Sequence, residues 1–248
     1  MSKSSLKITY NFSANFDPKK RKFKEIKFLI FHYTGMKSEI NAIKKLTDLK
    51  SKVSSHYFIK KNGEIINLVP DLYTSWHAGI SSWKNYKFLN SNSIGIEISN
   101  PGHEFSYKKF SANQIKSIIK LSKFLVKKYK INSKNILGHS DIAPERKKDP
   151  GEKFPWQLFS KNKIGIWFDL SHSKLVKMRK KSTTDYEKKI FIQNLIKIGY
   201  QKNYNMKKNR YIKILSKAFQ RRFRQKLIDG LVDQECFIIS QNLVKKFN

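Results

Sequence analysis

The sequence of 248 residues contains a single cysteine, Cys236, so it cannot form an internal disulfide. A lone thiol with apolar neighbours is typical of a buried packing residue in a reducing compartment. No stretch reaches the roughly 18 consecutive apolar residues of a membrane-spanning helix, and residues 1–27 lack the apolar core of a secretory signal. We therefore expect a globular cytoplasmic protein without a membrane span, or a periplasmic or exported one if a leader has been removed.

Acidic residues are scarce, with 18 Asp and Glu against 52 Lys and Arg and a formal charge of +34. Such a charge attracts polyanions, which include nucleic acid and cell-wall fragments rich in carboxylates. Only 7 of the basic residues are arginine, whose flat guanidinium is the better reader of phosphates and base edges. The lysines are scattered among abundant Ile, Asn, Phe and Tyr, as in proteins from AT-rich genomes. Nucleic acid is therefore not the partner that we expect.

Positive charge is denser at the carboxyl end of the chain. Residues 1–160 carry a net charge of +18, and residues 161–248 carry +16 in little more than half the length. Apolar residues then recur every three or four positions in three stretches, which predicts three amphipathic helices separated near Gly199 and Gly230. We predict one domain over 1–160, a linker over 161–184 and a three-helix domain over 185–248.

Short apolar runs in the first part predict buried strands. The helix signal is clearest at Ser111, where Gln114 completes a capping box. The dipeptide Asn62-Gly63 suits the tight turn of a hairpin. The expected fold class is α/β, with a central mixed β-sheet flanked by helices and a small C-terminal three-helix bundle. The strands are expected at 28–31, 56–60, 64–69, 94–98 and 136–139.

Ionisable side chains collect where two of these strands end. His32 and His139 each lie at the carboxyl end of a predicted strand, and Asp149 follows His139 in a loop restricted by Pro144 and Pro150. Two imidazoles and a carboxylate, with a fourth position left to water, form a typical catalytic zinc set. Spacing alone leaves open the alternative that the histidines are structural.

Six blocks of sequence stand out in the first part of the chain: FHYTG at 31–35, VSSHY at 53–57, LVP at 68–70, WHAGISSW at 76–83, NSIGIEISN at 92–100 and GHSDIAPERKKDPG at 138–151. Together they resemble the zinc-dependent N-acetylmuramoyl-L-alanine amidases of the type 2 amidase family. The resemblance implies a central mixed sheet, one zinc ion per chain, and hydrolysis of the amide between N-acetylmuramic acid, or its 1,6-anhydro form, and the first L-alanine of the stem peptide. Its partners would be peptidoglycan or soluble muropeptides, and we expect a monomer.

The resemblance assigns roles to five residues. His32, His139 and Asp149 match the zinc ligands. Glu97 matches the acidic residue that faces the metal and would act as general base. Lys147 matches the catalytic lysine, whose charge would stabilise the oxyanion. Structural alternatives for the last two are an outward-facing strand carboxylate and a solvated lysine.

Further residues are candidates for binding substrate. Arg146 is a candidate partner for a stem-peptide carboxylate. Trp76 and His77 are expected to line the groove, although core positions fit them equally well. Tyr57 is placed near the site through strand packing, with His56 beside it. The remaining expectations are a supporting role for Asp141, which would orient the loop or a ligand imidazole, and no role for His103 or His172.

The tail stretch AFQRRFR at 218–224 is similar to a three-helix peptidoglycan-binding module found after some amidases of the family. The sequence departs from that module after Asp229-Gly230. Arg221, Arg222 and Arg224 would either bind an anionic ligand or form a solvated helix face. A non-catalytic binding protein for peptidoglycan or nucleic acid therefore remains the alternative to an enzyme.

Overall fold

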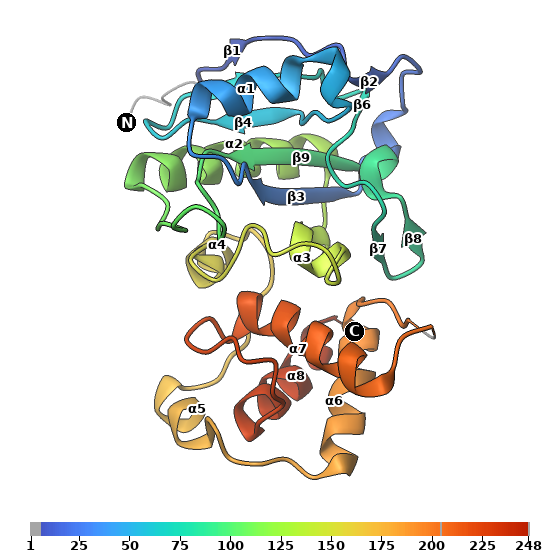
Figure 1. Cartoon of the computed structure of the whole chain (residues 1–248), viewed down its shortest axis with the longest axis vertical. Helices are drawn as coiled ribbons and strands as arrows, with labels where there is room; N and C mark the ends of the chain where they lie inside the picture. The colour runs from blue at the N-terminus through green and yellow to red at the C-terminus, as the bar shows by residue number, and fades with distance from the viewer. Residues whose placement is uncertain (1–5, 204, 248) are drawn as a thin grey trace.

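The computed structural model describes residues 6–203 and 205–247 and contains the predicted mixed sheet (Figure 1). Its six strands lie in the order β1-β5-β4-β9-β3-β10, and only the β4–β5 pair is antiparallel. Two small sheets pair β2 with β6 and β7 with β8. The strands are β1 Thr9–Tyr10, β2 Phe16–Asp17, β3 Phe28–Tyr33, β4 Tyr57–Ile59, β5 Ile65–Asn67, β6 Thr74–Ser75, β7 Ser82–Trp83, β8 Tyr86–Lys87, β9 Ser93–Ile98 and β10 Ile136–Gly138.

The helices follow the expected pattern, with α2 as the long helix of the first part. Within the described part of the chain, no helix combines the length and the apolar character of a membrane span. The α-helices are α1 Glu39–Thr47, α2 Ala112–Tyr129, α3 His139–Ile142, α4 Trp156–Lys161, α5 His172–Met178, α6 Asp185–Ile198, α7 Lys208–Phe223 and α8 Gln234–Phe247. Short 3-10 helices span Phe23–Glu25, Leu49–Ser51, Leu89–Asn92 and Ser133–Asn135.

The predicted local signals operate as expected. Ser111 and Gln114 form the reciprocal capping box at the start of α2. The β4–β5 hairpin turns at Gly63, whose φ is +90°. A Cβ at Gly63 would lie 2.8 Å from the backbone oxygen of Asn113, so the hairpin packs closely on the start of α2. The turn of the hairpin thus lies against the helix that covers one face of the sheet.

Side chains alternate between the two faces of the central strands β3 and β9, and both faces are largely buried. On one face, Phe31 and Ile96 pack with Leu125 of α2. On the other face, β9 presents Ser93, Gly95 and Glu97. In register with this second set, His32 lies beside Glu97. The second face therefore carries the polar chemistry.

Two groups of helices cover the second face. Leu46 of α1 packs on Phe58 of β4. At the opposite end of the sheet, Ile30 of β3 and Leu137 of β10 share a core with the C-terminal helices α6, α7 and α8, which lie below β3 in Figure 1. The residues predicted to form a linker include helix α5, whose Leu175 is buried in this same core. The division of the chain at 160 and 184 stays a prediction.

Arg222 of α7 joins the C-terminal helices to the sheet. Its side chain is 1% exposed and donates to the Asp141 carboxylate at 2.7 Å and to the carbonyl of Ile136 at 3.0 Å. Its guanidinium lies 4.6 Å from the ring centre of Trp156. Since β10 is an edge strand, Arg222 donates to a carbonyl to which no further strand can donate.

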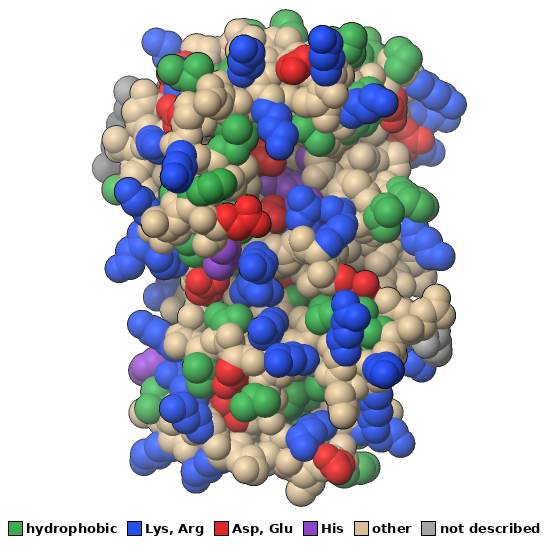
Figure 2. Space-filling view, in the orientation of Figure 1, with side chains coloured by type: hydrophobic (Ala, Val, Ile, Leu, Met, Phe, Trp, Pro, Cys, Tyr) green, Lys and Arg blue, Asp and Glu red, His purple; other side chains and the backbone are tan. Residues whose placement is uncertain are grey.

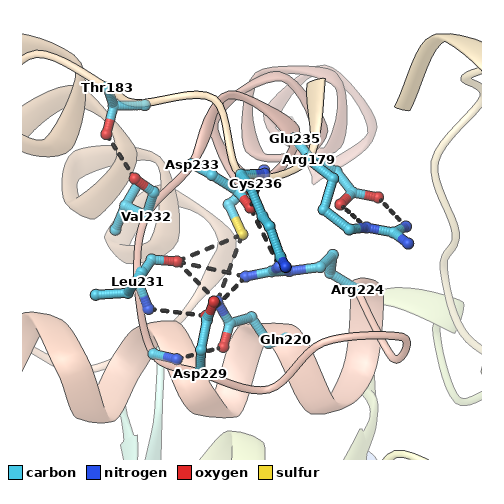
Figure 3. A network of polar contacts seen from close by, with 12 residues as sticks. Arg179, Thr183, Gln220, Arg224, Asp229, Leu231, Val232, Asp233, Glu235 and Cys236 are labelled. Carbon is cyan, nitrogen blue, oxygen red and sulfur yellow. Dashed lines mark hydrogen bonds and ion pairs between the residues drawn. The ribbon is translucent and has the colours of Figure 1, made fainter. Parts of the chain in front are cut away.

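Arg224 is 2% exposed and is also used internally (Figure 3). It forms ion pairs with Asp229 at 3.0 Å and Asp233 at 3.1 Å. The nearby Cys236 is buried, as predicted, and has no disulfide. The expectation that the arginines of 221–224 are solvated or free to bind anions is therefore wrong for Arg222 and Arg224, because both balance buried carboxylates.

We predict that Arg222→Met lowers the free energy of unfolding by about 3 to 5 kcal/mol, because it leaves the Asp141 carboxylate buried without its cation. Urea denaturation followed by circular dichroism measures the change. Arg210→Met is the matched control, since Arg210 lies on the same helix and is exposed; it should change stability by less than about 0.5 kcal/mol. Equal stability of the two variants would contradict the role of the ion pair.

Candidate active site

The three predicted ligands meet at the carboxyl edge of the sheet. His32 is the penultimate residue of β3, and His139 opens α3 directly after β10. Because β3 and β10 are adjacent and parallel, both side chains reach the same edge. The Nδ1 atoms of the two imidazoles lie 2.9 Å apart, and each lies 3.1 Å from Oδ2 of Asp149.

This triangle of acceptor atoms fits a metal ion. All three residues are buried. A tetrahedral zinc with bonds of about 2.0 to 2.1 Å holds its ligand atoms about 3.3 Å apart, close to the distances in the triangle. The Nε2 atom of His139 lies 3.1 Å from the carbonyl of Ala78, which can only accept, so that nitrogen carries the proton and Nδ1 presents a lone pair. The residues therefore form a group that is able to hold a metal.

The surroundings keep His32 and Asp149 in the protonation states that metal binding requires. Burial, followed by the nearby His139, lowers the pKa of His32 to about 4. Burial alone would raise the pKa of Asp149, but the two imidazoles beside it hold that pKa well below its usual value. At neutral pH His32 is therefore uncharged and Asp149 is ionised.

Glu97 lies on β9 beside His32 and lines a cavity of about 310 Å³ that also contains His139 and Asp149. Its Oε2 atom is buried and has no hydrogen-bond partner among the described residues. Burial, and then the charge of Asp149, raises the pKa of Glu97 to about 8. A carboxylate oxygen without a partner, beside the candidate metal, is well placed to exchange a proton with a bound molecule.

Lys147 also lines the cavity. Its backbone N–H donates to the carbonyl of Ala143 at 3.0 Å, and the N–H of Ser140 donates to the carbonyl of Asp149 at 2.8 Å. These bonds fold residues 139–149, the metal loop, back on themselves, so that the lysine lies on the same cavity wall as the ligands. The positive charge of Lys147 acts on Glu97, whose pKa it lowers against the larger effect of burial.

Arg146 has other partners than the one predicted. Its Nη2 donates to the carbonyls of Ala78 at 2.5 Å and Ile80 at 2.7 Å, and its Nε donates to Ile80 at 3.1 Å. The guanidinium therefore ties the segment 78–80 to the metal loop. Arg146 still lines the cavity. Because its Nε and Nη2 groups already donate to backbone carbonyls, carboxylate binding by Arg146 stays a prediction.

Trp76 and His77 line the cavity as expected, whereas Tyr57 does not. The Tyr57 hydroxyl donates to Asp71 at 2.6 Å, and its ring packs in the core under α2. Its neighbour Phe58, not Tyr57, is in register with Glu97. The placement of Tyr57 as a substrate-binding residue is therefore corrected, because alternation along β4 turns its side chain to the opposite face of the sheet.

Asp141 supports the loop but contacts no ligand imidazole. Its carboxylate accepts from the N–H of Gly138 at 2.8 Å and from the hydroxyl of Tyr200 at 2.7 Å, in addition to the ion pair with Arg222. It therefore fixes the start of α3, the helix whose first residue is His139. Of the two roles expected for Asp141, these contacts support the orientation of the loop.

His103 has a place at the cavity that the sequence did not indicate. Its Nδ1 lies 2.8 Å from the Tyr33 hydroxyl, and its Nε2 lies 3.0 Å from Glu152. It lines the same cavity as the candidate metal ligands. In Figure 2 histidine side chains are visible in the upper half of the molecule, with basic and acidic side chains around them. No motif surrounds His103, so only the folded chain identifies it.

The chain is similar to known proteins over most of its length. The family model described as N-acetylmuramoyl-L-alanine amidase matches residues 22–152. The N-acetylmuramoyl-L-alanine amidase AmiD of Escherichia coli is 34% identical over 237 residues, which cover 91% of this chain and 84% of that protein. The chain belongs to the N-acetylmuramoyl-L-alanine amidase family. It is an enzyme, and the bond it hydrolyses is the amide between N-acetylmuramic acid and L-alanine.

Solved structures of relatives extend the similarity through the C-terminal helices. AmiD from E. coli, in complex with anhydro-N-acetylmuramic acid-L-Ala-D-gamma-Glu-L-Lys, has a TM-score of 0.80 and covers 90% of each chain. AmpDh3 from Pseudomonas aeruginosa, in complex with anhydromuramic pentapeptide, has a TM-score of 0.79 at 30% identity and covers 98% of this chain and 99% of that one. The expected fold class is confirmed.

Two matched carboxylate-to-amide variants separate metal binding from catalysis. We expect Asp149→Asn to lose bound zinc, because the amide removes a charged ligand. We expect Glu97→Gln to keep about one zinc per chain and to lose at least about 100-fold in kcat, because an amide cannot accept the proton. Elemental analysis and an amide-hydrolysis assay measure the two quantities. Full activity of the Glu97→Gln variant, or zinc retained by the Asp149→Asn variant, would contradict these roles.

Proposed function

We propose that the protein is a zinc-dependent amidase that acts on soluble muropeptides, including the 1,6-anhydro form, in the recycling of cell-wall fragments. The observation that carries this proposal is the buried triangle of His32, His139 and Asp149 beside the unpaired carboxylate of Glu97. A binding protein without turnover, the alternative from the sequence, does not need an intact ligand set and a free carboxylate in one cavity.

The residues of this chain divide the chemistry among them. His32, His139 and Asp149 would hold the zinc ion, which would supply an acidified water and polarise the substrate carbonyl. Glu97, in its ionised form, would accept the proton that the water loses as the water oxygen bonds to the lactyl carbonyl carbon. The same carboxyl group then delivers this proton to the alanine nitrogen as the C–N bond breaks, which leaves a carboxylate on the sugar and a free amine on the peptide. Lys147 stabilises the oxyanion, an effect worth about 3 to 4 kcal/mol for one such donor.

The proposed substrate suits the shape and charge of the cavity. Lys45, Arg146, Lys147 and Lys148 line it, and their charge favours the carboxylates of a stem peptide. Trp76 offers an apolar surface to sugar or peptide on the same wall. The relatives AmiD and AmpDh3 were solved with anhydromuramyl peptides bound. The 1,6-anhydro-N-acetylmuramyl-L-alanine amidase AmpD of Citrobacter freundii is 36% identical over 108 residues, covering 44% of this chain and 56% of that protein.

Other expectations stay predictions. Peptidoglycan binding by the three-helix part of the chain would have to use side chains other than Arg222 and Arg224, which are internal. The cytoplasmic location and the monomeric state expected from the sequence are likewise proposals. Nucleic acid remains a partner that we do not expect.

The substrate proposal predicts a preference that depends on zinc. The zinc-loaded protein should release stem peptide from a soluble anhydromuropeptide at least about tenfold faster than from intact sacculi at equal substrate amounts, because the cavity is small and its basic side chains favour free peptide carboxylates. Chromatographic measurement of peptide release gives both rates. Activity should disappear with a chelator and return with added zinc. Faster release from sacculi, or release that a chelator does not affect, would contradict the proposal.

A further inference from the structure

The nitrogen of His32 that points away from the triangle contacts a second imidazole. Nε2 of His32 lies 2.9 Å from Nδ1 of His77. Nε2 of His77 lies 3.0 Å from the hydroxyl of Ser93, and that hydroxyl lies 2.6 Å from the carbonyl of Leu89. These groups are buried, so each proton in the chain of contacts needs a partner within it.

The last contact sets the direction of the others. A carbonyl can only accept, so the single hydroxyl proton of Ser93 goes to Leu89. The oxygen of Ser93 therefore accepts from Nε2 of His77. A neutral His77 then accepts through Nδ1 and receives the Nε2 proton of His32. This leaves Nδ1 of His32 with a lone pair that points at His139 and Asp149.

The chain also leaves room for His77 in this position. A Cβ on Gly95 would lie 2.4 Å from Cγ of His77, so the imidazole packs directly on the bare backbone of β9. Gly95 lies between Ser93 and Glu97 on the cavity face of that strand. The side-chain oxygen of Asn90 accepts from the N–H groups of His77 at 3.2 Å and Ala78 at 2.7 Å. Both the ring and the backbone of this segment are therefore fixed.

Ala78, the residue after His77, contacts the outer nitrogen of the other imidazole, that of His139. The carbonyl of Ala78 lies 3.1 Å from Nε2 of His139. It also accepts from Arg146, which anchors it to the metal loop. Two consecutive residues thus face the outer nitrogens of both histidine ligands.

We propose that His77 and the Ala78 carbonyl form one strap that fixes both imidazole ligands as the tautomer with the proton on Nε2 and the lone pair on Nδ1, so that His77 is a positioning residue for zinc. This inference rests on the proposed zinc site. It differs from a simple packing role, since a packing role requires the ring volume of His77 but not its acceptor atom.

The first test uses the unaltered protein without metal. Long-range proton–nitrogen NMR of the imidazoles should show the proton of His32 on Nε2 and a bare Nδ1. A His32 that is protonated on Nδ1, or that exchanges between both tautomers, would overturn the inference. This measurement requires no variant, and it is independent of catalysis.

The second test compares zinc dissociation constants by competition with a chelating dye. His77→Leu removes the acceptor and should weaken zinc binding about 10- to 100-fold. His77→Asn restores an acceptor near the position of Nδ1 and should recover at least half of the lost affinity on a logarithmic scale. His103→Leu is the matched control, because His103 lines the same cavity but contacts Tyr33 and Glu152; it should bind zinc as the unaltered protein does.

The outcomes separate this inference from the proposed function. Two results would overturn the role of His77 and leave the zinc amidase proposal intact. One is equal zinc affinity of the His77→Leu variant and the unaltered protein. The other is an equal loss of zinc affinity in the His77→Leu and His77→Asn variants. An unaltered protein that binds no zinc would instead overturn the proposed function.

Discussion

The rest of the structure depends on one constraint, the close approach of three buried acceptor atoms. These atoms belong to His32, His139 and Asp149 and lie 2.9 to 3.1 Å apart. Two lone pairs and a carboxylate repel one another unless a cation or a proton lies between them, and burial removes the water that would screen them. The fold resists this repulsion by its geometry. The parallel pairing of β3 with β10 places the imidazoles of His32 and His139 at one edge of the sheet. The backbone hydrogen bond from Ser140 to Asp149 closes the metal loop and brings the Asp149 carboxylate to the same edge.

The C-terminal helices contribute to this constraint. Asp141 holds the start of α3, where His139 lies, and its charge is balanced by Arg222 from α7. Ile30 and Leu137 of the sheet share one core with α6, α7 and α8. Helices α6, α7 and α8 therefore support the edge of the sheet that carries the candidate site. The same helices also bury apolar side chains of β3 and β10 that would otherwise lie on an open face of the sheet.

The sequence predicted the features that depend on local pattern. Apolar runs marked β3 and β9, the capping box marked α2, and the strand ends at His32 and His139 marked the site. Features that depend on contacts distant in sequence were missed. Nothing near Arg222 indicates that its partner lies 81 residues away, and nothing near His77 indicates its bond to His32. Tyr57 was misplaced because a shift of one residue along a strand reverses the face.

Product analysis in water labelled with oxygen-18 tests the central claim most directly. The zinc-loaded protein should convert an anhydro-N-acetylmuramyl peptide into anhydro-N-acetylmuramic acid that carries one labelled oxygen in its lactyl carboxylate, together with an unlabelled peptide that begins with a free L-alanine amine. Mass spectrometry identifies both products and their labels. Cleavage at another bond, label in the peptide, or the same products at the same rate from protein stripped of zinc would contradict the account.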